Sequence, residues 1–208
     1  MVVILVGIGL VRKRNQEICL TKMRFQISDI TKELSKKQDA LFQPINKQIL
    51  SQGFYIRLDF TMDNKQSFSA CRMYEHGPTR SKCILKFPSK SSRQKTIMEV
   101  YSQFEDGSIL FSTNSLDDQK YSFPPSVTVQ KYSPEDSVET IIDSHTETAY
   151  RLNEGGKKVI FNPKEPLFGF LQKRYQERMT HLNSLGLFTK KNQFWTPRFS
   201  LKRLFSKP

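Results

Sequence analysis

The sequence lacks long hydrophobic runs, cysteine pairs and the common catalytic motifs. Its longest apolar stretch, Met1 to Val11, is about half of the roughly 20 residues that a membrane-spanning helix needs. The 3 cysteines, Cys19, Cys71 and Cys83, include no C-x-x-C pair, which favours free thiols in a reducing compartment. No P-loop, G-x-G-x-x-G or G-x-S-x-G motif occurs, so nucleotide binding and serine-hydrolase chemistry have no support in the sequence.

Acidic residues are scarce at both ends of the chain, and the formal net charge is +13. Residues 1–53 carry 9 Lys and Arg against 4 Asp and Glu, residues 54–155 carry 12 against 14, and residues 156–208 carry 12 against 2. The middle of the chain is therefore nearly neutral. Basic ends indicate a partner with dispersed negative charge, which is either an anionic membrane surface or nucleic acid.

An apolar segment followed at once by basic residues opens the sequence. Positive charge after the apolar run places the rest of the chain on the cytoplasmic side of a membrane. We predict a membrane anchor in residues 1–14, either the second half of a spanning helix that begins upstream or a short anchor in the interface. A buried strand over residues 2–6 is the alternative. The predicted membrane contacts are Val2, Val3, Ile4, Leu5, Val6, Ile8, Leu10, Val11, Arg12, Lys13 and Arg14.

The C-terminal segment 189–208 mixes basic and aromatic residues. It has 6 Lys and Arg and no acidic residue, interleaved with phenylalanines and the only tryptophan. Aromatic rings of this kind enter the headgroup boundary while the cations meet anionic lipid, so one partner explains both ends. Binding of RNA or single-stranded DNA by stacking, or a disordered basic tail, are the alternatives. The predicted membrane contacts here are Trp195, Arg198, Phe199, Lys202 and Arg203.

Alternating polarity predicts strands in the middle of the chain. The clearest run is 54–60, whose apolar side chains Phe54, Ile56, Leu58 and Phe60 are expected on one face. Further strands are predicted at 67–74, 82–87 and 127–131, with Cys83, Leu85 and Phe87 facing inward.

A central hairpin is predicted over residues 97–114. Asp106-Gly107 separates two apolar runs, which favours a two-residue type I′ turn with Phe104 opposite Ile109. In this register Val100, Phe104 and Phe111 share one face of the sheet.

Helices are predicted on both sides of the strands. Residues 15–51 suggest a helical connector, with a short helix from Pro44 to Leu50 that ends before Gly53. Ser133-Pro134 is a helix start and Gly155-Gly156 a helix end, and between them an apolar stripe recurs at helical spacing. The stripe is Val138, Ile141, Ile142, His145, Ala149 and Leu152. A further helix is predicted from Pro166 to Leu185.

Together these elements predict an α+β fold. We expect an antiparallel sheet of about five strands, with the 134–152 helix packed on its Val100, Phe104 and Phe111 face. Helical extensions are expected at both ends. The predicted organisation is an anchor at 1–14, a helical connector at 15–52, the α+β domain at 53–155, and a basic helical extension and tail at 156–208.

Three polar residues are the candidates for chemistry. Glu75 and His76 end a strand beside Gly77, in a position where loops often carry function, and His145 lies on the apolar stripe. His145 and Glu147 are not spaced four residues apart and do not share a helical face, so a half-buried histidine explains His145 better than a metal ligand does. The sequence predicts no cofactor, and an enzyme site at Glu75, His76 and His145 is only the third hypothesis.

The order of the elements resembles a known group. The FEDGS sequence at Phe104–Ser108 leads to Ser112-Thr113-Asn114, a proline-containing loop follows, and a helix of the form SVETIIDSHTETAYRL occupies Ser137–Leu152. Over residues 45–155 the chain resembles a widespread group of uncharacterised bacterial proteins, often with an N-terminal transmembrane anchor. The resemblance implies a membrane-anchored α+β domain and no catalytic residues. The chain departs from the group in residues 77–95 and in its short anchor.

The sequence therefore predicts a membrane-associated binding or scaffolding module on the cytoplasmic face of a membrane, with an anionic membrane surface as partner. A nucleic-acid-binding protein that uses the basic C-terminal extension is the first alternative, and an enzyme is the second.

Overall fold

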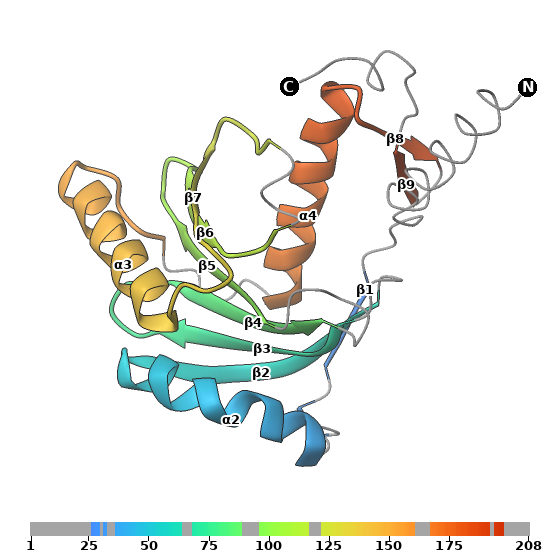
Figure 1. Ribbon diagram of the computed structural model, residues 1–208. Coiled ribbons are helices and arrows are strands. Elements are labelled where there is room, and N and C mark those ends of the chain that lie inside the picture. The colour runs from blue at the N-terminus through green and yellow to red at the C-terminus, as the bar shows by residue number, and fades with distance from the viewer. Residues whose placement is uncertain are drawn as a thin grey trace, which may run out of the picture.

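The computed structural model describes residues 26–29, 31–32, 36–63, 68–88, 96–116, 122–160, 167–191 and 194–197. These residues form a seven-stranded mixed sheet, three helices and a separate two-stranded hairpin (Figure 1). The α+β class is confirmed. The predicted anchor at 1–14 and the tail beyond Pro197 lie outside the described residues.

The sheet keeps the order of the sequence. Its strands are β1 (Gln26–Asp29), β2 (Phe54–Asp63), β3 (Phe68–His76), β4 (Lys82–Pro88), β5 (Ile97–Gln103), β6 (Ile109–Thr113) and β7 (Val127–Lys131). All neighbours are antiparallel except β6 and β7, which run parallel with Ile109 opposite Val127. The predicted antiparallel sheet of about five strands is confirmed in part, since the sheet has seven strands and its last pair is parallel. β1 lies where we expected helix, and the long 114–126 connection returns the chain to the start of β6, as a parallel pairing requires.

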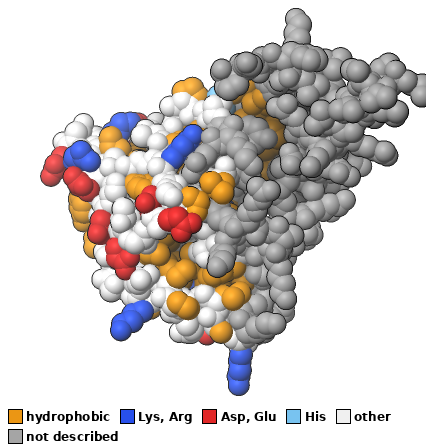
Figure 2. Space-filling view, in the orientation of Figure 1, with side chains coloured by type: hydrophobic (Ala, Val, Ile, Leu, Met, Phe, Trp, Pro, Cys, Tyr) orange, Lys and Arg blue, Asp and Glu red, His pale blue; other side chains and the backbone are white. Residues whose placement is uncertain are grey.

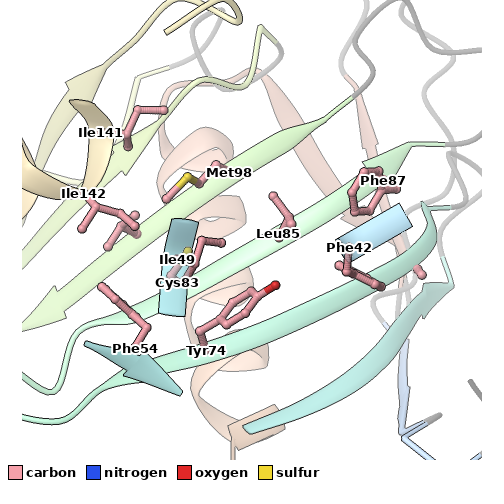
Figure 3. Close-up of a cluster of buried hydrophobic side chains, with 12 residues drawn as sticks. Phe42, Ile49, Phe54, Tyr74, Cys83, Leu85, Phe87, Met98, Ile141 and Ile142 are labelled. Carbon is pink, nitrogen blue, oxygen red and sulfur yellow. The ribbon is translucent and has the colours of Figure 1, made fainter. Parts of the chain in front are cut away.

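Helices cover both faces of this sheet. The α2 helix (Lys36–Ser51) and the α3 helix (Val138–Glu154) bury Phe42, Ile49, Ile141 and Ile142 against one face (Figure 3). The α4 helix (Leu167–Ser184) begins on the other face, where Phe170 and Leu171 pack on β2, β3 and β4 (Figure 1). We had expected helix on only one face of the sheet. The segments before and after the predicted domain also supply core residues, because each carries a few large apolar side chains in a largely polar stretch.

Two predicted helix starts are misplaced. α2 begins two turns before Pro44, which lies inside the helix. α3 begins after Ser137, whose hydroxyl accepts the Thr140 amide proton at 3.1 Å, while Ser133 and Asp136 form the preceding turn. Both Ser133 and Ser137 are competent N-caps, and only the second precedes the apolar stripe directly. The predicted end of α3 is confirmed, since Gly156 has a φ of +94° and its amide binds the Asn153 carbonyl.

The β5–β6 hairpin has a three-residue loop, so the predicted type I′ turn is wrong. Phe104 pairs with Ser108, and Gln103 is opposite Ile109. Gly107 has a φ of +80°, whereas Asp106 does not have a positive φ, which is the pattern of a type I turn followed by a left-handed residue. The one-residue shift moves Phe111 to the opposite face, where its ring stacks on Tyr101 at 4.6 Å. Leu110 takes its place beside Phe104 and Ala149 of α3.

A bulge in β2 divides the run that was predicted to face one way. The register with β3 shifts between Ile56 and Leu58. As a result Phe54 is buried with α2 and α3, whereas Leu58 and Phe60 pack on the α4 side. The extra residue also turns Asp59 toward α2, because side chains alternate along a strand and the bulge breaks that alternation.

The segment after α4 begins as a hairpin. The strands β8 (Phe188–Lys191) and β9 (Phe194–Pro197) are antiparallel, with Lys190 opposite Trp195 and Lys191 opposite Phe194. Phe188 is buried with Met179 and Leu182 of α4, which fixes the start of the hairpin to that helix.

Candidate functional site

Most predicted membrane-contact residues lie outside the described part of the chain. Residues 2–14 and Arg198, Phe199, Lys202 and Arg203 lie outside the described residues. Trp195 is in β9, paired with Lys190. In the part of the chain that the structure describes, none of the helices is long and apolar enough to cross a bilayer.

Charge is distributed unevenly over the described elements. Acidic side chains gather over α3, at the left of the molecule in Figure 2. The segment 133–154 carries Glu135, Asp136, Glu139, Asp143, Glu147 and Glu154 against the single base Arg151. The described part of 167–197 has the opposite balance, with Lys173, Arg174, Arg178, Lys190 and Lys191 against Glu177. The two helices lie on opposite faces of the sheet, so the domain is polarised.

Beneath α3, a continuous chain of hydrogen bonds crosses the core. It joins eight side chains from the β3–β4 turn to α3, namely His76, Thr79, Ser81, Ser102, His145, Ser112, Gln130 and Thr148. The donor–acceptor distances along this chain of hydrogen bonds range from 2.5 Å to 2.9 Å. Ser81, Ser102, His145 and Ser112 are each 0% exposed. A polar chain in such a place is stable only if every group finds a partner.

His145 is the central member of this chain. Its Nε2 contacts the Ser102 hydroxyl at 2.9 Å and its Nδ1 contacts the Ser112 hydroxyl at 2.8 Å, so β5 and β6 together hold the ring. Burial lowers the pKa of His145 to about 3, and the imidazole is therefore neutral near pH 7. The interpretation of His145 as a satisfied residue of the apolar stripe agrees with this environment, although the ring is buried completely and not by half.

His76 terminates the chain near the protein surface. Its Nδ1 accepts the Thr79 amide proton at 3.2 Å and contacts the Thr79 hydroxyl, and its ring packs on Phe54. Burial lowers the pKa of His76. Gly53 approaches the ring closely, because a Cβ there would lie 3.0 Å from Nε2, and its φ of +81° also favours glycine.

Glu75 does not join the two histidines. Neighbouring strand residues point to opposite faces, and the Glu75 carboxylate pairs with Arg57 at 3.2 Å and Arg80 at 3.7 Å. The structure therefore connects His76 to His145 through three hydroxyl groups and leaves Glu75 outside.

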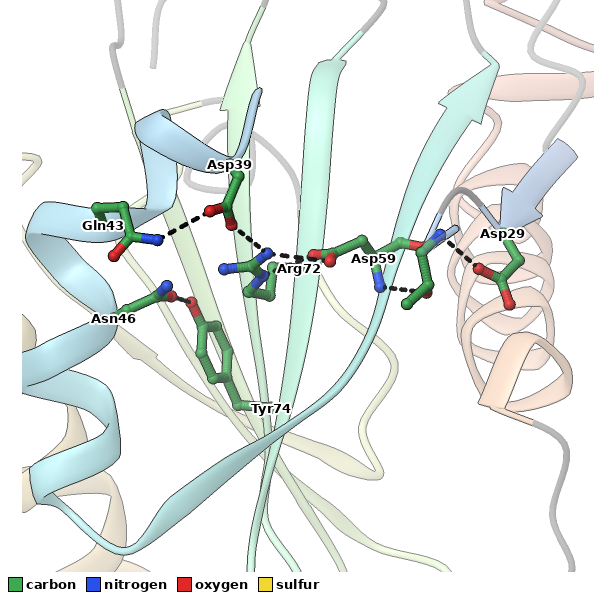
Figure 4. A network of polar contacts seen from close by, with 8 residues as sticks. Asp29, Asp39, Gln43, Asn46, Asp59, Arg72 and Tyr74 are labelled. Carbon is green, nitrogen blue, oxygen red and sulfur yellow. Dashed lines mark hydrogen bonds and ion pairs between the residues drawn. The ribbon is translucent and has the colours of Figure 1, made fainter. Parts of the chain in front are cut away.

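A second polar network links α2 to the sheet (Figure 4). Arg72 donates to both carboxylate oxygens of Asp59, at 2.6 Å and 3.0 Å, and to Asp39 of α2 at 2.9 Å. Its guanidinium lies over the Phe42 ring, 4.3 Å from the centroid. Burial opposes the charge on Arg72, but these hydrogen bonds outweigh it and raise the pKa of the guanidinium. The Tyr74 hydroxyl donates to the side-chain oxygen of Asn46, and this bond anchors α2 one turn after Phe42. This network orients α2 and is structural.

On the α4 face, a third network contains the buried pair Lys86 and Glu99. Glu99 also accepts the Tyr101 hydroxyl proton at 2.7 Å. Cys71 is opposite Lys86 in the sheet, but burial raises the pKa of its thiol to about 12, so the reactive thiolate is absent near neutral pH. Cys71 and Cys83 are free and buried, as predicted for small apolar side chains.

No three His, Cys, Asp or Glu side chains of the described segments are grouped as metal ligands would be. Comparisons with protein families, with curated proteins and with solved structures find no match to this chain.

Sequence reasoning found His76 and His145 but missed the hydroxyl groups that connect them. Ser81, Ser102 and Ser112 are common residues with no motif of their own. Two of them could have been noticed, because Ser102 and Ser112 interrupt apolar strands at positions that must face the core.

Proposed function

We propose that this chain is a binding or scaffolding module that associates with the cytoplasmic face of an anionic membrane. The polarity of the domain carries the proposal. Acidic α3 and the basic α4–β9 region belong to opposite sides of the sheet, and such a distribution orients a protein on a negatively charged surface.

The two ends of the described chain support the same orientation. In Figure 1, β1 and the β8–β9 hairpin both lie toward the right of the molecule, and α3 lies at the left. The apolar and basic residues 1–14 precede β1 in sequence, and the basic residues 198–208 follow β9. The described chain therefore begins and ends away from the acidic helix.

Co-sedimentation with lipid vesicles tests the proposal. The full-length chain should bind vesicles that contain phosphatidylserine and should bind phosphatidylcholine vesicles much less. The triple variant Arg198→Gln, Lys202→Gln, Arg203→Gln should lose a large part of this binding. Lys36→Gln, Lys47→Gln, Lys158→Gln is the matched control, because it removes the same charge from exposed positions before and after the strands. Equal loss in both variants would show that only net charge matters.

Cell fractionation tests the N-terminal contribution. The intact chain should be found with membranes, and a chain without residues 1–14 should be released at high salt, since only electrostatic contact remains. A full-length chain that stays in the soluble fraction at low salt would remove the main support for membrane association.

Nucleic-acid binding is the outcome that would replace this proposal. Salt-dependent binding to RNA or single-stranded DNA, combined with no preference for anionic vesicles, would assign the basic tail to stacking and phosphate contact. The enzyme hypothesis required one pocket with Glu75, His76 and His145, and the outward ion pairs of Glu75 argue against it.

A further inference from the structure

The second half of α4 has a small hydrophobic core of its own. Phe170, in the first turn of the helix, packs on the main sheet, whereas Met179 and Leu182 are buried with Phe188 of β8. The far end of α4 therefore supports the β8–β9 hairpin. In Figure 1 this end of the helix and the hairpin lie at the upper right, and the acidic α3 helix lies at the left.

Leu185 is held on the surface by the way in which α4 ends. Gly186 follows it with a φ of +70°, and the Leu187 amide donates to the Leu182 carbonyl at 2.9 Å. This is the bond of a Schellman helix end, in which the residues on either side of the turn, here Leu182 and Leu187, pack together. Leu185 lies outside that contact and is 47% exposed. The α4–β8 turn thus presents an apolar side chain in a fixed position.

The sequence around this turn is positively charged. A single exposed leucine is ordinary on a protein surface, so its surroundings decide what it means. Residues 178–208 contain seven Lys and Arg and no Asp or Glu. The last acid before this stretch, Glu177, is paired with Arg174 at 2.9 Å. An apolar side chain in a stretch of cations is complementary to an anionic surface that covers a hydrocarbon layer.

Other exposed apolar side chains have different surroundings. Tyr150 is 49% exposed, but Glu147 and Glu154 lie three residues before it and four residues after it, on the same side of α3. Leu50 is 42% exposed, and it lies at the end of α2 that packs beside the same acidic helix. Contact with a negatively charged surface is therefore less favourable at both places than at the α4–β8 turn.

We propose that the α4–β8 turn is the part of the described fold that enters the membrane, with the Leu185 side chain in the headgroup boundary. This role of the turn rests on the proposed membrane association and adds the element that makes the contact. Charge draws a basic segment to any polyanion, whereas an apolar side chain gains free energy only where a hydrocarbon layer removes it from water. The turn therefore favours a bilayer over nucleic acid.

A tryptophan moved into the turn tests this contact directly. Trp195 is the only tryptophan, so the double variant Leu185→Trp, Trp195→Phe has a single one, in the turn. Leu50→Trp, Trp195→Phe is the matched control, because Leu50 has a similar exposure. On vesicles of phosphatidylserine and acyl-chain-brominated phosphatidylcholine, the first variant should be quenched several-fold more than the second. Equal quenching, or no quenching at position 185 in a chain that co-sediments with the vesicles, would overturn the proposal.

Removing the apolar side chain gives a second measurement. Leu185→Ser should weaken binding of the full-length chain to phosphatidylserine vesicles by roughly tenfold, because the leucine no longer leaves water on binding. Leu50→Ser removes the same group elsewhere and should bind as the wild type does. A Leu185→Ser chain that binds as tightly as Leu50→Ser would count against the turn. Melting temperatures show whether both variants fold, and if Leu185→Ser does not, the quenching measurement decides.

Failure of this role and failure of the proposed function give different results. A wild-type chain that does not bind anionic vesicles overturns membrane association and the role of the turn together. A wild-type chain that binds, while position 185 is not quenched and Leu185→Ser has no effect, overturns the role of the turn alone and leaves membrane association in place.

Discussion

Arg72 of β3 donates to both carboxylate oxygens of Asp59 on β2, and both side chains are at least nine-tenths removed from solvent. The pair exists because the β2 bulge turns Asp59 toward α2, where Asp39 completes the set of acceptors. Removing one partner of such a buried pair is strongly destabilising, whereas replacing both with apolar residues of similar volume changes stability little.

Breaking the pair should destabilise the fold strongly. Asp59→Leu alone leaves a buried guanidinium with only Asp39, and we expect a loss of about 3–5 kcal/mol in the free energy of unfolding. The double variant Asp59→Leu, Arg72→Met should recover most of this loss, since two apolar groups then fill the space. Urea unfolding of the two variants gives both values. A double variant as unstable as the single one would mean that the network, and not the charge, is essential.

His145 should give the protein an acid-sensitive stability. Its pKa is about 3 in the folded protein and 6.5 in an unfolded chain, so above pH 6.5 both states are neutral there and stability is greatest. As the pH falls from 6.5 toward 3, only the unfolded state takes up the proton, and stability should fall by roughly 1.4 kcal/mol per pH unit. His145→Gln should be less stable at pH 7 and should show a shallower pH dependence in this range. Stability curves of the wild type and the variant that stay parallel between pH 6.5 and 3 would contradict a buried, neutral His145.

The hairpin tip should respond to a lower pH. Asp106 binds Lys157 at 2.7 Å and also accepts from Ser108, and these contacts hold the pKa of its carboxyl well below the ordinary 3.8. Stability from this contact is complete above pH 3.8 and is lost as the pH falls through the folded-state pKa. Asp106→Asn should therefore melt below the wild type at pH 7, and the gap should close in strong acid. Lys157→Met should reproduce the pH 7 loss.

Gly107 should tolerate asparagine better than valine. Nothing lies within 4 Å of the position that a Cβ would occupy, so the cost of a substitution comes from the positive φ alone. Valine should cost about 1–2 kcal/mol or more, and asparagine clearly less, because asparagine visits the left-handed region readily. Chemical denaturation of the two variants measures the difference, and equal stabilities would contradict a left-handed residue here.

Local patterns predicted what depends on nearby residues. The stripe of α3 is buried at Ile141, Ile142, His145 and Ala149 as its spacing required, and β4 directs Cys83 and Leu85 inward. Each depends only on the repeat of one element.

The sequence-based predictions were wrong where the pairing between strands decides which way a side chain faces. Asp-Gly suits both a two-residue and a three-residue loop, and one residue of difference reversed the face of Phe111. Regular alternation through residues 54–60 gave no sign of the β2 bulge. The hydroxyl chain depends on the registers of four strands, so single residues such as Ser81 carried no signal for it.

The parallel pairing of β6 with β7 has a consequence for the order of folding. Strands β2 to β6 are joined by short connections and can assemble by local contacts, whereas β7 must return across a longer loop before it pairs. Gln130 belongs to β7 and Thr148 to the helix that follows it. We therefore expect this edge to be the last part of the sheet to form and the first to open, so that slow amide exchange should spread from β3 and β4 and fade toward β7.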